Sequence, residues 1–298
     1  MSAPADMDAG EPLVTIGMPV YNGERFLREA LDSVLAQTWR RFLLRISDNG
    51  STDSTPAICA EYARRDSRID YRRRDTNRGA VWNFNELARG AATPYFAWHA
   101  ADDRAAPGHL EACLAAFEQR PAAVLAYVRA ESIDSRGHAL PGNQPRLALG
   151  SERVSERFAA CLAPIPYAEN ATYGLMKTDV LQQTRLFGVF GGSDRAFLAE
   201  FSLYGPFARV EQVLFQRRVP DATRAETEVQ RYNTAGRSRF SLREWRILAW
   251  NLRSIRRAPR PLEGRARLYG LVLRRLLKHS NLYISELTVA LKGLASQN

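Results

Sequence analysis

The sequence is poor in cysteine and histidine and has no long hydrophobic run. Only three cysteines, Cys59, Cys113 and Cys161, occur among 298 residues, and their wide spacing provides neither a disulfide framework nor a zinc site. No apolar run approaches the roughly 18 residues that span a bilayer, and the polar, acidic start of the chain lacks the pattern of a signal peptide. We therefore expect a protein of the reducing cytoplasm.

The positive charge of the chain is concentrated at one end. The net charge is +10, yet residues 237–298 contain 14 Arg and Lys against three Glu, which leaves the first 236 residues at about −1. We expect a flexible N-terminus over residues 1–12, a main domain over 13–236 and a basic, helical extension over 237–298. The basic charge therefore says little about the chemistry of the main domain.

Apolar runs alternate with segments of helical spacing over most of the main domain. Strands are expected at Leu13–Met18, Phe42–Ile46, Ile69–Arg73, Tyr95–Trp98, Ala123–Val128, Thr172–Met176 and Ala208–Gln216. Helices are expected at Leu27–Leu35, after Thr55, at Val81–Ala88, after Pro107 and at Asp194–Tyr204. This alternation predicts an α/β fold with a mostly parallel sheet flanked by helices. Residues 13–128 would form a nucleotide-binding half, and residues 129–236 an acceptor half.

Turn residues and carboxylates follow three of these apolar runs. They occur in Met18-Pro19-Val20-Tyr21-Asn22-Gly23, in Ser47-Asp48-Asn49-Gly50-Ser51-Thr52-Asp53 and in Ala101-Asp102-Asp103. Each alone is also consistent with an ordinary turn, a helix cap or a loop. Parallel α/β sheets bind ligands at the carboxyl ends of their strands, and adjacent carboxylates there would be relieved by a cation. Together the motifs favour a nucleotide diphosphate held through Mn²⁺ or Mg²⁺.

These motifs, together with Asn77-Arg78-Gly79, resemble the successive motifs of family 2 glycosyltransferases, which are inverting enzymes with the GT-A fold. The resemblance is clear over residues 13–130 and weaker to about 220. It implies a nucleotide-sugar site formed by Pro19, Tyr21, Asn22, Asp48, Asn77, Arg78 and Asp102, and a metal ligand at Asp103. The sequence departs from the family pattern at Asn49 and Ala100, where many members have aspartate.

Inversion at a sugar carbon requires a base that takes the proton of the attacking hydroxyl, and a carboxylate is the usual group. The segment Gly191-Gly192-Ser193-Asp194 resembles the family element that supplies it, so Asp194 is the candidate and Glu169 a weaker alternative. Alternatively, Asp194 only stabilises the N-terminus of its helix, where the helix dipole favours an acidic residue.

The resemblance implies transfer of a sugar from a nucleoside diphosphate sugar, expected to be UDP-linked, to a hydroxyl of a saccharide or lipid-linked acceptor in polysaccharide or glycoconjugate synthesis. A sugar-nucleotide nucleotidyltransferase and a non-catalytic binding protein are the alternatives, although residues 18–24 lack the Gly-rich phosphate loop of the former. The basic extension either packs on the domain or contacts the inner face of the membrane. No nucleic-acid partner is expected, because no nucleic-acid-binding motif is present.

Overall fold

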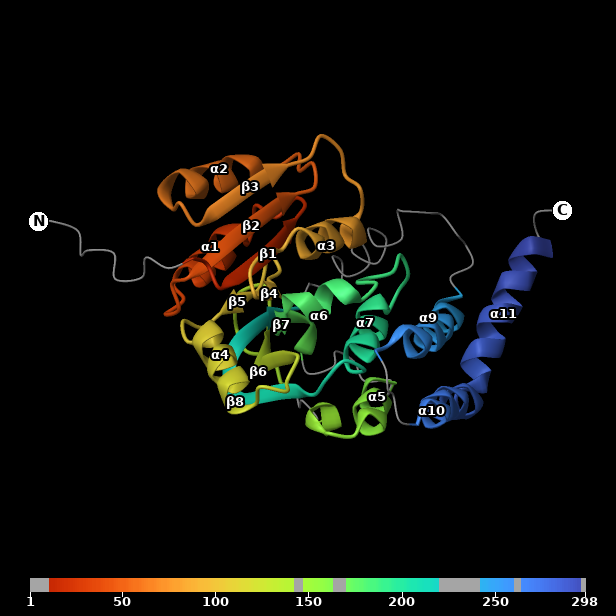
Figure 1. Ribbon diagram of the computed structural model, residues 1–298. Coiled ribbons are helices and arrows are strands. Elements are labelled where there is room, and N and C mark those ends of the chain that lie inside the picture. Colours follow the sequence, from red (N-terminus) through yellow and green to blue (C-terminus); the bar gives the residue numbers. More distant parts are fainter. Residues whose placement is uncertain (1–10, 142–146, 163–169, 220–241, 260–263, 296–298) are drawn as a thin grey trace, which may run out of the picture.

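The computed structural model describes residues 11–141, 147–162, 170–219, 242–259 and 264–295. Its centre is a sheet of eight strands in the order β3-β2-β1-β4-β7-β6-β8-β5, shown in Figure 1. The strands are β1 (Val14–Val20), β2 (Phe42–Asp48), β3 (Ile69–Arg73), β4 (Tyr95–Trp98), β5 (Arg104–Ala105), β6 (Leu125–Ile133), β7 (Leu175–Lys177) and β8 (Phe207–Arg218).

Strands β3, β2, β1 and β4 are parallel, as the alternating pattern predicts. Strand β7 runs antiparallel between β4 and β6, and the two-residue strand β5 pairs antiparallel with β8. Strand β6 pairs in parallel with β8. The mostly parallel α/β sheet expected from the sequence is therefore present. Its antiparallel pairings lie in the part of the sheet beyond β4.

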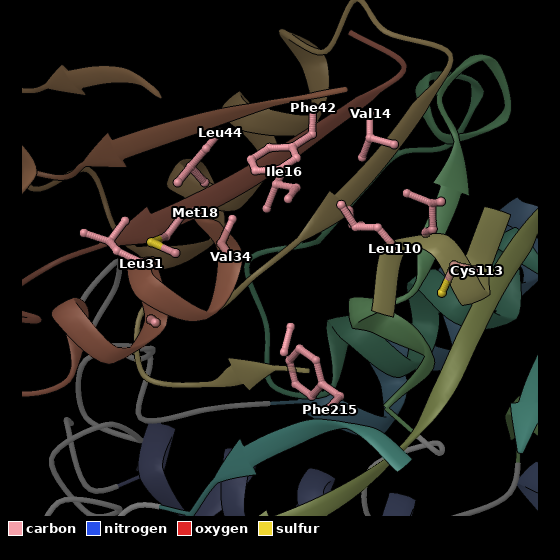
Figure 2. Packing of buried hydrophobic residues seen from close by; sticks show 14 of the residues in the cluster. Val14, Ile16, Met18, Leu31, Val34, Phe42, Leu44, Leu110, Cys113 and Phe215 are labelled. Atoms are coloured by element: carbon pink, nitrogen blue, oxygen red, sulfur yellow. The ribbon is translucent and has the colours of Figure 1, made fainter. Parts of the chain in front are cut away.

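Helices cover both faces of the sheet and divide the core into two clusters. One face carries α1 (Leu27–Leu35) and α2 (Thr55–Arg65) beside β1, β2 and β3, and α4 (His109–Gln119) beside β6 and β8. Figure 2 shows this cluster, with Ile16 and Met18 facing Val34 and Leu31. The other face carries α3 (Ala80–Arg89), α5 (Val154–Leu162), α6 (Thr178–Gln183) and α7 (Ser193–Phe201). Alternate residues of a strand, and residues three or four apart in a helix, point to the same side, and it is these apolar residues that are buried between the sheet and its helices.

Three helices follow in the basic extension: α9 (Arg243–Arg257), α10 (Arg265–Lys278) and α11 (Ser280–Ala295). Ile255 of α9, together with Leu268 and Val272 of α10, completes the second core cluster. The carboxylate of Glu244 lies 2.8 Å from Arg275 and 3.3 Å from Arg195 of α7. The extension is thus packed on the main domain through both apolar contacts and a largely buried ionic cluster.

Candidate active site

The site begins where the pairing of β1 with β4 ends. That pairing stops at Gly17 and Trp98, whereas β1 continues beside β2 as far as Val20 and Asp48. The carbonyl of Gly17 accepts from the His99 N–H, and Pro19 faces the same side two residues later. Pro19 has no N–H to donate, so it is tolerated in this central strand because its ladder partner has already ended.

The loops after β1 and β2 are bound to each other by a set of hydrogen bonds. The N–H groups of Asn22 and Gly23 donate to the hydroxyls of Ser51 and Thr55, each at 2.9 Å. In return the Asn22 amide oxygen accepts from the Thr52 N–H at 2.8 Å. A Cβ added to Gly23 would lie 3.7 Å from the Ala101 Cβ, so the loop after β4 is adjacent as well. The partly buried Tyr21 begins this loop.

Thr55 begins α2, but its hydroxyl does not cap that helix. Instead of capping α2, it accepts from Gly23, and the helix has no side-chain cap among its described contacts. The Thr55 hydroxyl thus helps to hold the loops after β1 and β2 together. Pro56 still stands in the first turn, where its missing N–H costs nothing.

Asp48 lies at the end of β2 and is completely buried. One carboxylate oxygen accepts from the Ser51 N–H at 2.8 Å, and the other accepts from the Tyr71 hydroxyl at 3.0 Å. Burial and this hydrogen bond raise the pKa of Tyr71, so Tyr71 remains a neutral donor. Arg73 lies 3.7 Å from the same carboxylate. The side chain of Asp48 therefore holds the second loop in shape, in addition to any contact with a ligand.

Asn49 connects the second loop to the segment Asn77-Arg78-Gly79. Its amide nitrogen donates to the Asn77 side-chain oxygen at 2.8 Å and to the Gly79 carbonyl at 3.2 Å. Its amide oxygen accepts from the Arg78 N–H at 3.0 Å. The adjacent Gly50 has φ +78°, and a Cβ there would lie 3.1 Å from the Asn77 nitrogen. An aspartate at position 49 would lack both donated bonds, which explains why asparagine suits this chain.

The carboxylate pair lies at the end of β4, and Asp103 is the more buried of the two, with 3 % of its surface exposed. Asp103 accepts from the Arg218 N–H at 2.8 Å. The guanidinium of Arg218 donates to the Asp102 carbonyl at 2.9 Å and to Glu29 at 2.6 Å. Burial and then the charge of Asp102 raise the pKa of Asp103 well above its usual range. A buried carboxylate next to another carboxylate is an energetically costly arrangement that a cation would relieve.

The residues present fit an oxygen-preferring cation. Asp102 and Asp103 supply carboxylate oxygens, and Mg²⁺ or Mn²⁺ typically takes one or two of these together with phosphate oxygens. Within the described ranges, no group of three or more His, Cys, Asp and Glu is placed to hold a metal. Such an ion would therefore depend on its ligand's phosphates for the rest of its coordination.

His99 and Trp98 precede the pair and belong to the core beneath it. The Nδ1 of His99 donates to the Ala100 carbonyl at 2.9 Å, and burial lowers the pKa of His99 to about 4. His99 is therefore neutral, and its ring lies against Phe215, with ring centres 5.6 Å apart. Trp98 is buried and stacks on Phe187 with ring centres 4.8 Å apart, so it is a core residue.

Asp194 is exposed in the first turn of α7, and its helix is connected to the β4 end through aromatic packing. Phe197, one turn further along α7, lies 5.6 Å from Trp98 between ring centres. Asn85 of α3 exchanges two hydrogen bonds with the backbone of Phe187, at 2.8 and 2.9 Å. No contact joins Asp194 directly to the four motifs in the described residues. Glu169, the alternative base, lies outside the described residues.

Sequence reasoning missed Arg218 and Tyr71 as parts of the site. The expected strand ends at Gln216, although β8 continues to Arg218, which is 4 % exposed. A buried arginine at a strand end, ion-paired with Glu29, was not distinguishable from an exposed arginine by its neighbours in sequence. Tyr71 lies in a strand with few apolar residues, and nothing in that pattern indicates that its hydroxyl reaches Asp48.

The model of the family described as "Glycosyl transferase family 2" matches residues 15–181, more than half of the chain. The chain belongs to this family. An uncharacterized glycosyltransferase of Rickettsia typhi is 28% identical over 227 residues, which cover 75% of this chain and 67% of that protein. A putative glycosyltransferase of Bacillus subtilis, EpsE, is 34% identical over 114 residues, covering 38% of this chain and 41% of EpsE.

Solved structures confirm the GT-A-like fold of this family 2 chain. Staphylococcus aureus TarS residues 1–349, in complex with UDP-GlcNAc, superposes with a TM-score of 0.65 at 15% identity, over 89% of this chain and 73% of that one. The mannosyltransferase PcManGT of Pyrobaculum calidifontis, in complex with GDP-Man and Mn²⁺, superposes with a TM-score of 0.58 at 16% identity, over 97% of this chain and 75% of that one. In the described part of this chain, no helix has the length and apolar character to cross a membrane.

Proposed function

We propose that this glycosyltransferase moves a sugar from a UDP-sugar to an acceptor hydroxyl with inversion, in the synthesis of a polysaccharide or another glycoconjugate. The observation that carries the proposal is the convergence of four motifs that follow β1, β2, β3 and β4. Hydrogen bonds join the first to the second and the second to the Arg78 segment, and a Cβ added to Gly23 would lie 3.7 Å from the Ala101 Cβ. Convergence at this sheet edge is where α/β folds bind nucleotides.

The donor would lie across these loops. Tyr21 would stack on the base, with Pro19 and Asn22 shaping the loop around it, and Asp48 would contact the base from the end of β2. Arg78 is exposed, and its guanidinium lies 4.8 Å from the ring centre of Trp82, so its charge is oriented by stacking. It would face the diphosphate together with Asn77. Structures of TarS with UDP-GlcNAc and of PcManGT with GDP-Man support a nucleotide-sugar donor, and we choose uracil as the base.

Asp103 would hold Mn²⁺ or Mg²⁺ while Asp102 contacts the ribose. When bound, the ion supplies charge stabilisation to the departing diphosphate. Arg218 would keep Asp103 in place through its N–H, because its own guanidinium is fixed by Glu29 and the Asp102 carbonyl. Asp194 would accept the proton of the acceptor hydroxyl, and its exposure leaves it accessible to an acceptor. The acceptor would be a saccharide or a lipid-linked saccharide.

A donor screen tests the proposal. Purified full-length protein is incubated with nucleoside diphosphate sugars and mixed saccharide acceptors in Mn²⁺, Mg²⁺ or EDTA, and the release of nucleoside diphosphate is measured. Release with a UDP-sugar that stops in EDTA supports the proposal. Release of pyrophosphate instead would favour a nucleotidyltransferase, and donor binding without any release would favour a non-catalytic binding protein.

A further inference from the structure

The outer side of α10 carries two adjacent stripes, one apolar and one basic. Tyr269, Leu273 and Leu277 follow one another at four-residue spacing, with exposed fractions of 37%, 54% and 67%. Arg274 and Lys278 are exposed next to them on the side away from the domain. The opposite side of the helix, with Leu268 and Val272, is buried in the second core cluster. The residues of the apolar stripe therefore do not take part in packing α10 on the domain.

Helix α11 continues this character. Ile284, Leu287 and Leu291 share one flank of the helix and have exposed fractions of 61%, 39% and 65%. Tyr283, in contrast, is buried, and its carbonyl accepts from the Trp245 indole of α9 at 3.1 Å. Figure 1 shows α11 at the side of the molecule away from α2 and β3. Together with the exposed Lys292, α10 and α11 present leucine side chains next to cations at one end of the protein; we call this surface the tail face.

We propose that the tail face binds peripherally to a membrane surface that contains anionic lipid. Leucine and tyrosine side chains would enter the boundary of the acyl chains, while Arg274, Lys278 and Lys292 would pair with lipid phosphates. The charge of the tail face selects lipid over a second copy of this chain. Within the described residues of α10 and α11 the one acidic residue is Glu286, which already accepts from the Glu244 N–H at 3.0 Å. Two copies would therefore bring cations against cations.

The apolar stripe also selects lipid over other polyanions. A nucleic acid backbone would satisfy the cations but would leave the leucines between them in water, whereas a bilayer satisfies both. Docking in this way would keep the enzyme beside lipid-linked molecules. This inference does not depend on the donor or on the chemistry proposed above, since the tail face is formed by α10 and α11 and the four motifs by loops of the sheet.

Sedimentation with lipid vesicles tests the proposal. The full-length protein is mixed with vesicles of phosphatidylcholine alone, or of phosphatidylcholine with 30% phosphatidylglycerol, in about 0.1 M salt, where the Debye length is ~10 Å. We expect binding to the anionic vesicles that weakens as salt rises. The variant Arg274→Gln/Lys278→Gln/Lys292→Gln should bind about 100-fold more weakly, and Leu273→Gln/Leu277→Gln at least about tenfold more weakly.

A matched control removes the same number of charges elsewhere. Arg64→Gln/Arg89→Gln/Arg136→Gln changes three exposed arginines outside the tail face and should bind vesicles like the wild-type protein. Equal binding to both vesicle types, no binding, or equal loss in the control would overturn the proposal. Light scattering on the vesicle-free protein provides a further check. A dimer that Leu273→Gln/Leu277→Gln abolishes would show that a second copy, and not lipid, covers the tail face.

Discussion

Replacing Asn49 should weaken donor binding through the loop that it holds. Asn49→Ala removes two hydrogen bonds to the Asn77–Gly79 segment and one from the Arg78 N–H. At roughly 1 kcal/mol each, these bonds contribute about 3 kcal/mol to the order of that segment. If Arg78 must be in place to face the diphosphate, donor affinity falls up to about 100-fold. Asn49→Asp should be no better, because its carboxylate faces the Asn77 oxygen and the Gly79 carbonyl.

The assay is calorimetric titration of the donor, or of the nucleoside diphosphate, together with thermal unfolding. Asn85→Ala is the matched control, because it also removes a buried amide with two short backbone hydrogen bonds, but these go to Phe187. Both variants should lose stability, and only the Asn49 variants should lose donor affinity. The reasoning is wrong if Asn49→Ala binds the donor as the wild-type protein does while it is destabilised like Asn85→Ala.

Three further predictions concern ionisable residues of the site and its core. Asp194→Asn should reduce turnover roughly 10²- to 10⁴-fold while leaving the donor dissociation constant unchanged, and a kcat within twofold of wild type would exclude Asp194 as the base. Asp103→Asn should abolish metal-dependent turnover. In EDTA, however, this variant should melt at a temperature no lower than wild type, because burial and Asp102 raise the pKa of Asp103 and the charged carboxylate therefore destabilises the fold. A lower melting temperature in EDTA contradicts this. Burial also lowers the pKa of His99 to about 4 and that of His109 to about 3, so both are neutral when folded and bind protons on unfolding. The free energy of unfolding should therefore decrease as pH falls below ~6.5, by up to ~1.4 kcal/mol per pH unit for each histidine. Chemical denaturation at several pH values from 6.5 to 5 measures this, and the free energy of unfolding of His109→Gln should change less with pH than that of the wild-type protein.

The first half of the fold was predictable because its elements are continuous in sequence. The strands at Phe42 and Tyr95 and the helix at Leu27 begin at the expected residues, since each buries an unbroken periodic pattern. The rest of the fold was less predictable. Helix α5 lies in a region with weak periodicity, and strand β5 has two residues whose pairing with β8 comes from more than 100 positions away.

The parts of the site that are made by single loops were predictable, and those made by distant segments were not. The motifs around Asp48 and Asp103 stand at strand ends in the sequence itself, so their convergence follows from a parallel sheet. The contact of Asp103 with Arg218 spans 115 positions and depends on how far β8 extends. The role of Asn49 became clear only once the amide was seen to donate to the segment around Asn77.

The ionic cluster around Glu244 has a consequence for experiments with shortened proteins. Arg195 stands directly after Asp194 in α7, and its guanidinium is held 3.3 Å from Glu244 of α9. Deleting the last sixty residues would strip this cation of its counterion and expose the apolar side of α7 to water. Loss of activity in such a truncation would then be explained by a displaced α7, which carries the proposed base Asp194, as well as by loss of the proposed membrane contact. Point substitutions on the outermost helices separate the two.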